Sequence, residues 1–267
     1  MHTEISLEFA AAVGVLTLRP PEGKPPTLDH ELMDAFEAVL GEVESRAVGL
    51  TAVVVRSASP KFFCAGANLK VMESIDADSV VPWVHRGHRL MNRLENLPLP
   101  VIARVEGYAL GGGLELAMAC DLIFASTNAR FGQSEAKLGL VTGWGGCYRL
   151  ARRVGVARAK ELCYTGRMFD GAEAMRLGVA AWHGSAESLE QHLSEFIAAV
   201  GENSRTAVRE MKRILNTCAT TSLGENAAIE AAASQRCLTE GDAPQRLREF
   251  FEARKSPAAA SRAGSTP

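Results

Sequence analysis

Val105-Glu-Gly-Tyr-Ala-Leu-Gly-Gly-Gly-Leu-Glu-Leu-Ala-Met-Ala-Cys-Asp121 is a segment in which three consecutive glycines separate a short apolar run from a helix-forming run. Glycine lets a backbone turn sharply and come close to a ligand. The first N–H groups of a helix lack intrahelical partners and lie at the positive end of its dipole, so they suit a developing negative charge. We expect Gly112 to supply such an N–H donor. The alternative is a flexible turn without a ligand.

The same segment excludes two common nucleotide motifs. A dinucleotide fingerprint needs the spacing Gly-x-Gly-x-x-Gly, and a phosphate loop ends in Gly-Lys-Ser/Thr. Neither pattern is present between Val105 and Asp121. The glycines therefore point to another kind of ligand.

Two glutamates follow the glycines along the chain. Glu115 falls in the first turn of the expected helix, among Leu114, Leu116, Ala117, Met118 and Ala119. A helix that is apolar almost all round is buried, and a buried carboxylate needs a partner or a function. Glu135 follows in Arg130-Phe-Gly-Gln-Ser-Glu-Ala-Lys-Leu-Gly-Leu140. For each glutamate taken singly, a solvated helix carboxylate is the alternative.

A second segment of small residues, Phe62-Phe-Cys-Ala-Gly-Ala-Asn-Leu-Lys70, also runs from an apolar stretch toward a helix. Asn68 is a suitable N-cap for that helix. Alone the segment reads as an ordinary loop. Together with the glycine segment it would place two N–H donors around one carbonyl oxygen, which stabilises an enolate or a tetrahedral oxyanion.

The order of apolar patterns predicts an α/β core followed by a helical portion. Strands are expected where valine and isoleucine cluster, at Val13–Leu18, Thr51–Val55, Val101–Val105 and Leu122–Ala125. Helices are expected at Asp29–Val43, Val80–Leu97, Ala157–Tyr164, Ala172–Leu177, Ser188–Val200, Thr206–Cys218 and Glu225–Cys237. Alternating strands and helices favour right-handed crossovers. We predict a core over 1–200, a helical portion over 201–255 and a disordered tail over 256–267.

Composition narrows the class of protein. The 267 residues are 47% hydrophobic and 22% charged with a net charge of -2, which is typical of a globular chain and disfavours general binding to nucleic acid or anionic membranes. No secretory signal is visible at the start, and no apolar run reaches the ~20 residues of a membrane span. Six scattered cysteines without a Cys-x-x-Cys pair indicate reduced thiols in a cytoplasm and no zinc site. His85 and His88 without a further ligand do not predict a metal site.

Five motifs in this order resemble the crotonase, or enoyl-CoA hydratase, superfamily. They are Ala65-Gly-Ala-Asn-Leu-Lys70, Gly107-Tyr-Ala-Leu-Gly-Gly-Gly-Leu-Glu115, Asp121, Phe131-Gly-Gln-Ser-Glu135 and Leu138-Gly-Leu-Val-Thr-Gly-Trp-Gly-Gly146, and the similarity extends from about Val13 to Arg254. The resemblance implies a ββα spiral core with a helical C-terminal trimerisation portion. It implies oxyanion N–H donors at Ala67 and Gly112 and acid–base glutamates at Glu115 and Glu135.

The same resemblance implies reversible hydration of the 2,3 double bond of a 2-enoyl-CoA. No metal or redox cofactor is implied, since coenzyme A is part of the substrate, and the expected assembly is a homotrimer or a dimer of trimers. Substrate contacts are implied at Lys24, Lys61, Ala65, Lys70, Gly143 and Trp144. The alternatives are another crotonase reaction, such as hydrolysis, decarboxylation or a double-bond shift, and a crotonase-fold binding protein without catalysis.

The sequence departs from the family pattern at several positions, most of them near the expected substrate. Asn68 stands where hydratases usually have aspartate, and Trp144 replaces a small residue near the expected acyl pocket. Cys147-Tyr-Arg replaces the usual Thr-Gln-Arg. Ser234 and Ala253 stand where relatives often place residues that cover the adenine, so Arg254 or Lys255 is the candidate substitute. Trp144 is expected to shape the acyl pocket, and its alternative is core packing.

Overall fold

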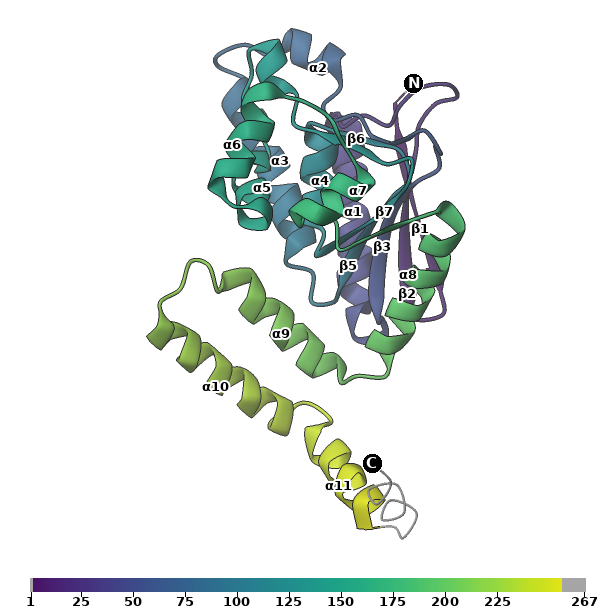
Figure 1. Cartoon of the computed structure of the whole chain (residues 1–267), viewed down its shortest axis with the longest axis vertical. Helices are drawn as coiled ribbons and strands as arrows, with labels where there is room; N and C mark the ends of the chain where they lie inside the picture. The colour runs from purple at the N-terminus through teal and green to yellow at the C-terminus, as the bar shows by residue number, and fades with distance from the viewer. Residues whose placement is uncertain (1, 256–267) are drawn as a thin grey trace, which may run out of the picture. The chain divides into compact units, whose positions relative to one another are not determined.

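The computed structural model describes residues 2–255 (Figure 1). The chain divides into two compact units, and the division falls between Ala198 and Ala199. The predicted strands and helices are all present, with ends that match or shift by up to three residues. The division into portions 1–200 and 201–255 stays a prediction, because contacts within a chain do not show that either unit folds alone. The tail predicted over 256–267 lies outside the described residues.

The first unit contains two sheets. The larger runs in the order β1 (Glu4–Ala10), β2 (Val13–Arg19), β3 (Ala52–Ser57), β5 (Val101–Val105), β7 (Leu122–Ser126) and β10 (Trp182–Gly184), and all its pairs are parallel except β1 with β2. The smaller runs in the order β4 (Phe62–Cys64), β6 (Tyr108–Leu110), β8 (Arg130–Gly132) and β9 (Phe169–Asp170). From β3 to β8, successive strands alternate between the two sheets. This alternation, with helices between the strand pairs, is the ββα spiral that the resemblance to the crotonase superfamily implied.

The helices of the first unit are α1 (His30–Arg46), α2 (Leu69–Ser74), α3 (Val80–Glu95), α4 (Gly112–Ala119), α5 (Gly146–Val154), α6 (Val156–Thr165), α7 (Gly171–Leu177) and α8 (Ala186–Gly201). Two 3₁₀ helices, η1 (Ala47–Gly49) and η2 (Glu135–Leu138), complete it. Five short strands, β1 and helix α5 are elements that the sequence did not predict.

Helices cover both faces of the larger sheet. Val53 and Val55 of β3 belong to a core cluster that includes residues of α1, α3 and α4. Ala52 and Val54 of the same strand belong to a second cluster with Leu189 of α8. Because side chains alternate across a strand, β3 must be apolar at consecutive positions, as buried parallel strands are. The valine run at positions 53–55 has this cause.

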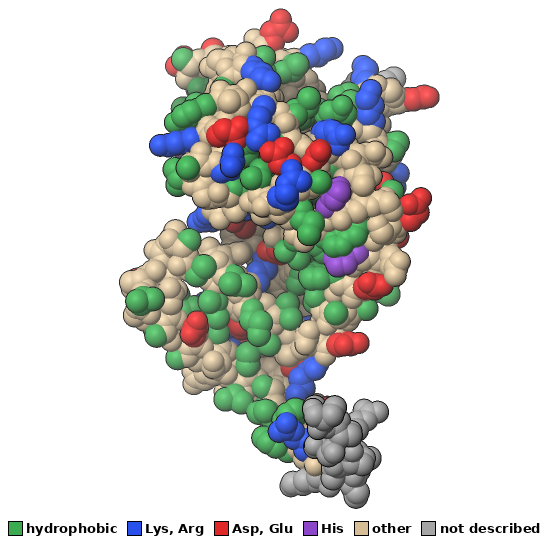
Figure 2. Space-filling view, in the orientation of Figure 1, with side chains coloured by type: hydrophobic (Ala, Val, Ile, Leu, Met, Phe, Trp, Pro, Cys, Tyr) green, Lys and Arg blue, Asp and Glu red, His purple; other side chains and the backbone are tan. Residues whose placement is uncertain are grey.

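The second unit contains α9 (Arg205–Thr217), α10 (Leu223–Thr239) and α11 (Ala243–Lys255). Helix α10 begins with a capping box in which Ser222 and Glu225 bond each other's backbone N–H groups. Figure 2 shows green, hydrophobic side chains at the surface of these helices. The large apolar side chains exposed on them are Met211, Leu215, Leu223, Leu238, Leu247, Phe250 and Phe251. Across residues 2–255 no helix is long and apolar enough to span a bilayer.

Candidate active site

Two glycines bring the predicted donor segments into contact. Gly111, with φ 52°, precedes the first residue of α4, and Gly66 has φ 93°. A Cβ added to Gly66 would lie 2.9 Å from the backbone nitrogen of Gly112 and 2.8 Å from the carbonyl oxygen of Leu110. Only glycine fits such an approach. The loop before α2 is thereby packed against the start of α4.

The backbone of Ala67 is oriented by a short parallel bridge to Leu28. Leu28 N–H donates to the Gly66 carbonyl, and Asn68 N–H donates to the Leu28 carbonyl, each at 2.8 Å. In a parallel bridge the two bonds are made by the neighbours of the central residue, so the N–H of Ala67 faces away from Leu28. Ala67 lines the cavity described next.

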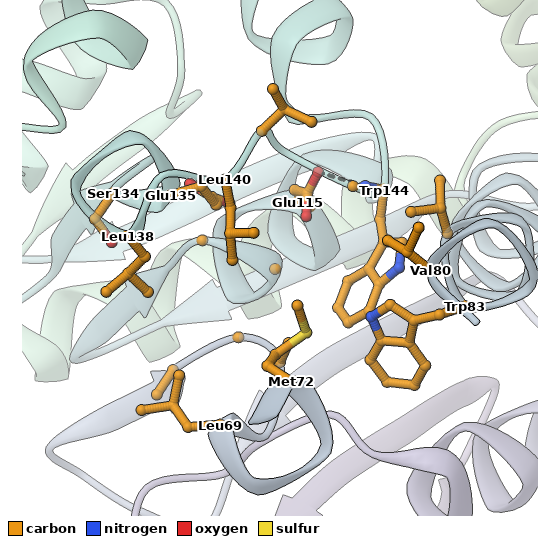
Figure 3. Close-up of a pocket in the computed structure, with 18 residues that line it drawn as sticks. Leu69, Met72, Val80, Trp83, Glu115, Ser134, Glu135, Leu138, Leu140 and Trp144 are labelled. Carbon is orange, nitrogen blue, oxygen red and sulfur yellow. Dashed lines mark hydrogen bonds between the residues drawn. The ribbon is translucent and has the colours of Figure 1, made fainter. Parts of the chain in front are cut away.

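Most of the predicted site residues line one cavity, with a volume of about 180 Å³ (Figure 3). Seven of the ten candidates line it: Ala65, Ala67, Gly112, Glu115, Glu135, Gly143 and Trp144. The other lining residues are Gly66, Leu69, Met72, Val80, Trp83, Val84, Gly111, Ser134, Leu138, Leu140 and Val141. Glu115 and Glu135 are the only ionisable groups among the described lining residues, and the remainder of the wall is mainly apolar. An acidic pair in an apolar cavity suits acid–base chemistry.

Glu115 is held by backbone donors from a distant loop. It lies in the first turn of α4 with only 2% of its surface exposed. Its Oε1 accepts hydrogen bonds from the N–H groups of Trp144 and Gly146, both at 2.7 Å. Burial, and secondly the charge of Glu135, raise the pKa of Glu115 to about 7. The buried position inferred from its apolar neighbours is confirmed.

Glu135 enters the cavity from a different element, the 3₁₀ helix η2. Its carboxylate lies beside the glycine turn, since a Cβ on Gly111 would be 3.1 Å from Glu135 Oε1. Within the described part of the chain, its Oε2 is buried and has no hydrogen-bond partner. Burial raises the pKa of Glu135 above the usual range. Burial of this kind favours the protonated carboxyl over the carboxylate.

The indole of Trp144 is wedged between two helices. A Cβ on Gly112 of α4 would lie 2.5 Å from its Cζ3, and a Cβ on Gly87 of α3 would lie 2.0 Å from its Cδ1 and Nε1. Trp83 packs edge-on against it with ring centroids 5.2 Å apart (Figure 3). Trp144 is therefore both a cavity wall and a core residue; that the cavity holds the acyl group stays a prediction.

Sequence reasoning missed Trp83 and Gly87 as site residues. A glycine in a helix interior costs about 1 kcal/mol relative to alanine, so its presence at 87 signals a close packing partner. That signal was available, but it does not name the partner. Trp83 gave no signal beyond its place on the buried face of α3.

Two predicted lysines lie at a second cavity. Lys24 and Lys61 line a space of about 280 Å³ formed by residues 20–24 and 58–62. Lys70 is exposed in the first turn of α2, where its N–H donates to the Asn68 side chain at 3.0 Å, so the predicted N-cap is confirmed. Arg254 is exposed on α11, over the ring of Phe250. The side chain of Lys255 lies outside the described residues.

Across residues 2–255, no three His, Cys, Asp or Glu side chains gather closely enough to hold a metal ion. His85 and His88 therefore have no further ligand of these types beside them there. The roles of all ten candidate residues stay predictions at this point.

Comparison with known proteins places the chain in a family. A sequence model described as enoyl-CoA hydratase/isomerase matches residues 8–259. The short-chain-enoyl-CoA hydratase of Clostridium acetobutylicum is 34% identical over 251 residues, covering 94% of this chain and 95% of that protein. The crotonyl-CoA hydratase of Syntrophomonas wolfei is 32% identical, covering 96% and 97%. A crystal structure of an enoyl-CoA hydratase from Bacillus anthracis superimposes with a TM-score of 0.87 at 32% identity, covering 94% and 96%. This chain belongs to the enoyl-CoA hydratase/isomerase family.

Proposed function

We propose that this protein is a hydro-lyase that adds water reversibly across the 2,3 double bond of a 2-enoyl-CoA thioester. The observation that carries the proposal is the presence of both Glu115 and Glu135 on the wall of one apolar cavity. The relatives named above are hydratases. Hydrolysis, decarboxylation, isomerisation and non-catalytic binding are not favoured by them.

The thioester oxygen is assigned to the two N–H groups of Ala67 and Gly112. Both residues line the cavity, and Gly112 begins a helix, so its N–H lies at the positive end of the dipole. As water adds at C3, negative charge moves from the double bond onto the thioester oxygen. Two fixed donors stabilise that enolate more than the neutral substrate, which lowers the barrier.

The two carboxylates divide the proton transfers. Glu115, with Oε1 held by two N–H groups, orients water through its other oxygen and accepts a proton as the hydroxyl bonds to C3. Glu135, whose pKa is raised by burial, is assigned the role of the acid and gives its proton to C2. A proton then returns from Glu115 to Glu135 through solvent. This acid–base cycle needs no metal or redox cofactor, and it gives syn addition when both carboxylates face the same side of the substrate.

The acyl group is proposed to be short and uncharged. Trp83 and Trp144 close one side of the cavity, and its described lining contains no Lys, Arg or His. An acyl carboxylate there would lose its hydration without gaining a counter-ion, which costs several kcal/mol. The cavity thus selects apolar acyl groups over acidic ones.

The coenzyme A portion is assigned to the lysines. Lys24 and Lys61 line a common cavity, and ammonium groups there suit the phosphates. Ala65, Lys70 and Gly143 remain candidates for further contacts. The homotrimer or dimer of trimers and the cytoplasmic location are likewise proposals. The exposed apolar side chains of α9–α11 support a subunit contact, since such patches normally mark interfaces.

The test uses the purified full chain with crotonyl-CoA and mass spectrometry of the products. We expect a gain of one water and no free coenzyme A. Hydrolysis would release free coenzyme A, and a double-bond shift would leave the mass unchanged, so either result as the main outcome overturns the proposal. Glutaconyl-CoA, whose acyl group carries a terminal carboxylate, is compared with crotonyl-CoA to test whether the pocket selects uncharged acyl groups. Its kcat/KM should be at least about 100-fold lower, and equal values would refute an uncharged pocket.

A further inference from the structure

A buried arginine, Arg149, contacts the loop 144–146, whose N–H groups bond Glu115. The side chain of Arg149, on α5, is 2% exposed. Its Nη2 donates to Oε2 of Glu95 at 2.6 Å and to Oδ1 of Asn92 at 2.8 Å, both on α3. Its Nε also donates to Glu95 Oε2, at 3.2 Å. The guanidinium is thereby fixed in position and orientation by α3.

The third nitrogen of that guanidinium, Nη1, donates to the loop itself. Nη1 of Arg149 donates to the carbonyl oxygen of Trp144 at 2.7 Å. A Cβ on Gly145 would lie 2.2 Å from this Nη1, and Gly145 has φ 103°, so the loop packs directly on the guanidinium. The N–H groups on either side, those of Trp144 and Gly146, are the two that bond Glu115. One side of the loop therefore faces Arg149 and the other faces Glu115.

We propose that Arg149 is a positioning residue, which holds the Trp144–Gly146 loop so that its two N–H groups stay aimed at Glu115. A buried ion pair gives little net stability, because desolvation of both charges offsets their attraction. The planar guanidinium of arginine, in contrast, carries its N–H donors in a fixed arrangement, so it holds the groups that it bonds in a defined orientation. The proposal rests on the proposed function only for its kinetic readout.

The electrostatic surroundings of Glu115 give the proposal a specific signature. Glu135 on η2 raises the pKa of Glu115, while the two loop N–H groups and the charge of Arg149 lower it. Tyr148 of α5 and Cys163 of α6 also interact with Glu115, and burial raises the pKa of both, so they are neutral at pH 7. The Glu95 carboxylate on α3 is paired with Arg149. Loss of Arg149 removes a charge and misaligns two donors, and each change makes Glu115 more basic.

The test compares Arg149→Gln, Arg149→Lys and the control Arg152→Gln. Arg152 lies on the same helix and reaches the same Glu95 from the surface, with its side chain 40% exposed. Rates of crotonyl-CoA hydration are measured against pH. Arg149→Gln should lower kcat about 10- to 100-fold with a smaller change in KM, the usual result of misplacing a catalytic group. Its acid limb should move to higher pH. Arg149→Lys should give an intermediate kcat, and Arg152→Gln should match the parent protein.

A second readout does not depend on turnover. The carboxylic acid band of Glu115 in pH-difference infrared spectra is assigned by its loss in Glu115→Gln, and its midpoint should rise in Arg149→Gln. An unchanged midpoint in a folded variant would overturn the proposal. Should Arg149→Gln not fold, the same two measurements on Arg149→Lys decide. Failure of the parent protein to hydrate crotonyl-CoA would refute the proposed function. The positioning role of Arg149 would then be decided by the infrared midpoint of Glu115 alone.

Discussion

Replacing Gly87 by alanine should force the Trp144 indole out of its slot. The added Cβ would lie 2.0 Å from Cδ1 and Nε1 of the indole, whereas carbon atoms in contact sit about 3.5–4.0 Å apart. The ring cannot simply slide away, because its far edge lies against Gly112 and Trp83 packs against it in a T-shaped contact. Overpacking of this kind costs about 1–3 kcal/mol in the free energy of unfolding. Trp144→Ala alone should cost about 3–5 kcal/mol through the cavity it leaves.

The double mutant is the decisive case. Once Trp144 is alanine, the new methyl at 87 has space, and alanine is about 0.5–1 kcal/mol better than glycine in a helix. The same change at 87 therefore reverses sign, giving a coupling of about 1.5 kcal/mol or more between the two positions. Urea denaturation followed by circular dichroism measures all four free energies. Additivity within about 0.5 kcal/mol would mean that the indole does not lie between α3 and α4.

The remaining predictions concern chemistry. Glu115→Gln and Glu135→Gln should each lower kcat on crotonyl-CoA by about 10²- to 10⁴-fold while thioester binding, measured by calorimetry, survives; the double mutant should lose much less than the product. Trp144→Ala should raise kcat/KM for longer or branched acyl groups relative to crotonyl. The difference in transition-state binding should be about 1–3 kcal/mol per methylene-sized change in the acyl group, and an unchanged ratio of kcat/KM values would contradict the role of Trp144 as a wall. The kcat/KM profile should show an acid limb near pH 7, where Glu115 loses its proton. Glu115→Gln should also stabilise the fold by about 2–3 kcal/mol more at pH 8 than at pH 5, measured by urea denaturation.

Local patterns predicted the parts of the site that lie close together in sequence. The apolar neighbours of Glu115 predicted its burial, because they form one short helix whose every face is covered. Glycines 111 and 112 predicted the turn from β6 into α4, since few other residues could occupy it. The N-cap at Asn68 followed from residue type alone.

What the sequence did not predict depends on long-range contacts or on elements too short to show a period. Strands β4, β6 and β8 have three residues each, fewer than two repeats of strand alternation. Arg149 meets Asn92 and Glu95 across more than fifty residues, and no local pattern at 149 marks that pairing. The slot for Trp144 likewise joins α3 and α4. The resemblance to a known family supplied the pairing of Glu115 with Glu135, which periodicity could not.

Because Glu115 is costly to ionise in the folded state, its contribution to the free energy of unfolding falls as pH rises. Its folded pKa, about 7, lies above the ordinary 4.5, so the folded state binds this proton more tightly than the unfolded state. Below pH 4.5 both states are protonated and the carboxyl contributes no difference. As pH rises toward 7, the unfolded state loses its proton first, so stability falls, and above 7 the loss is complete at about 3 kcal/mol. Most of that loss, about 2–3 kcal/mol, falls between pH 5 and pH 8, and glutamine does not show it because its side chain does not titrate. Equal effects of Glu115→Gln on unfolding at the two pH values would show that the carboxyl has an ordinary pKa, and it would then be ionised well below neutrality instead of being poised as a base near pH 7.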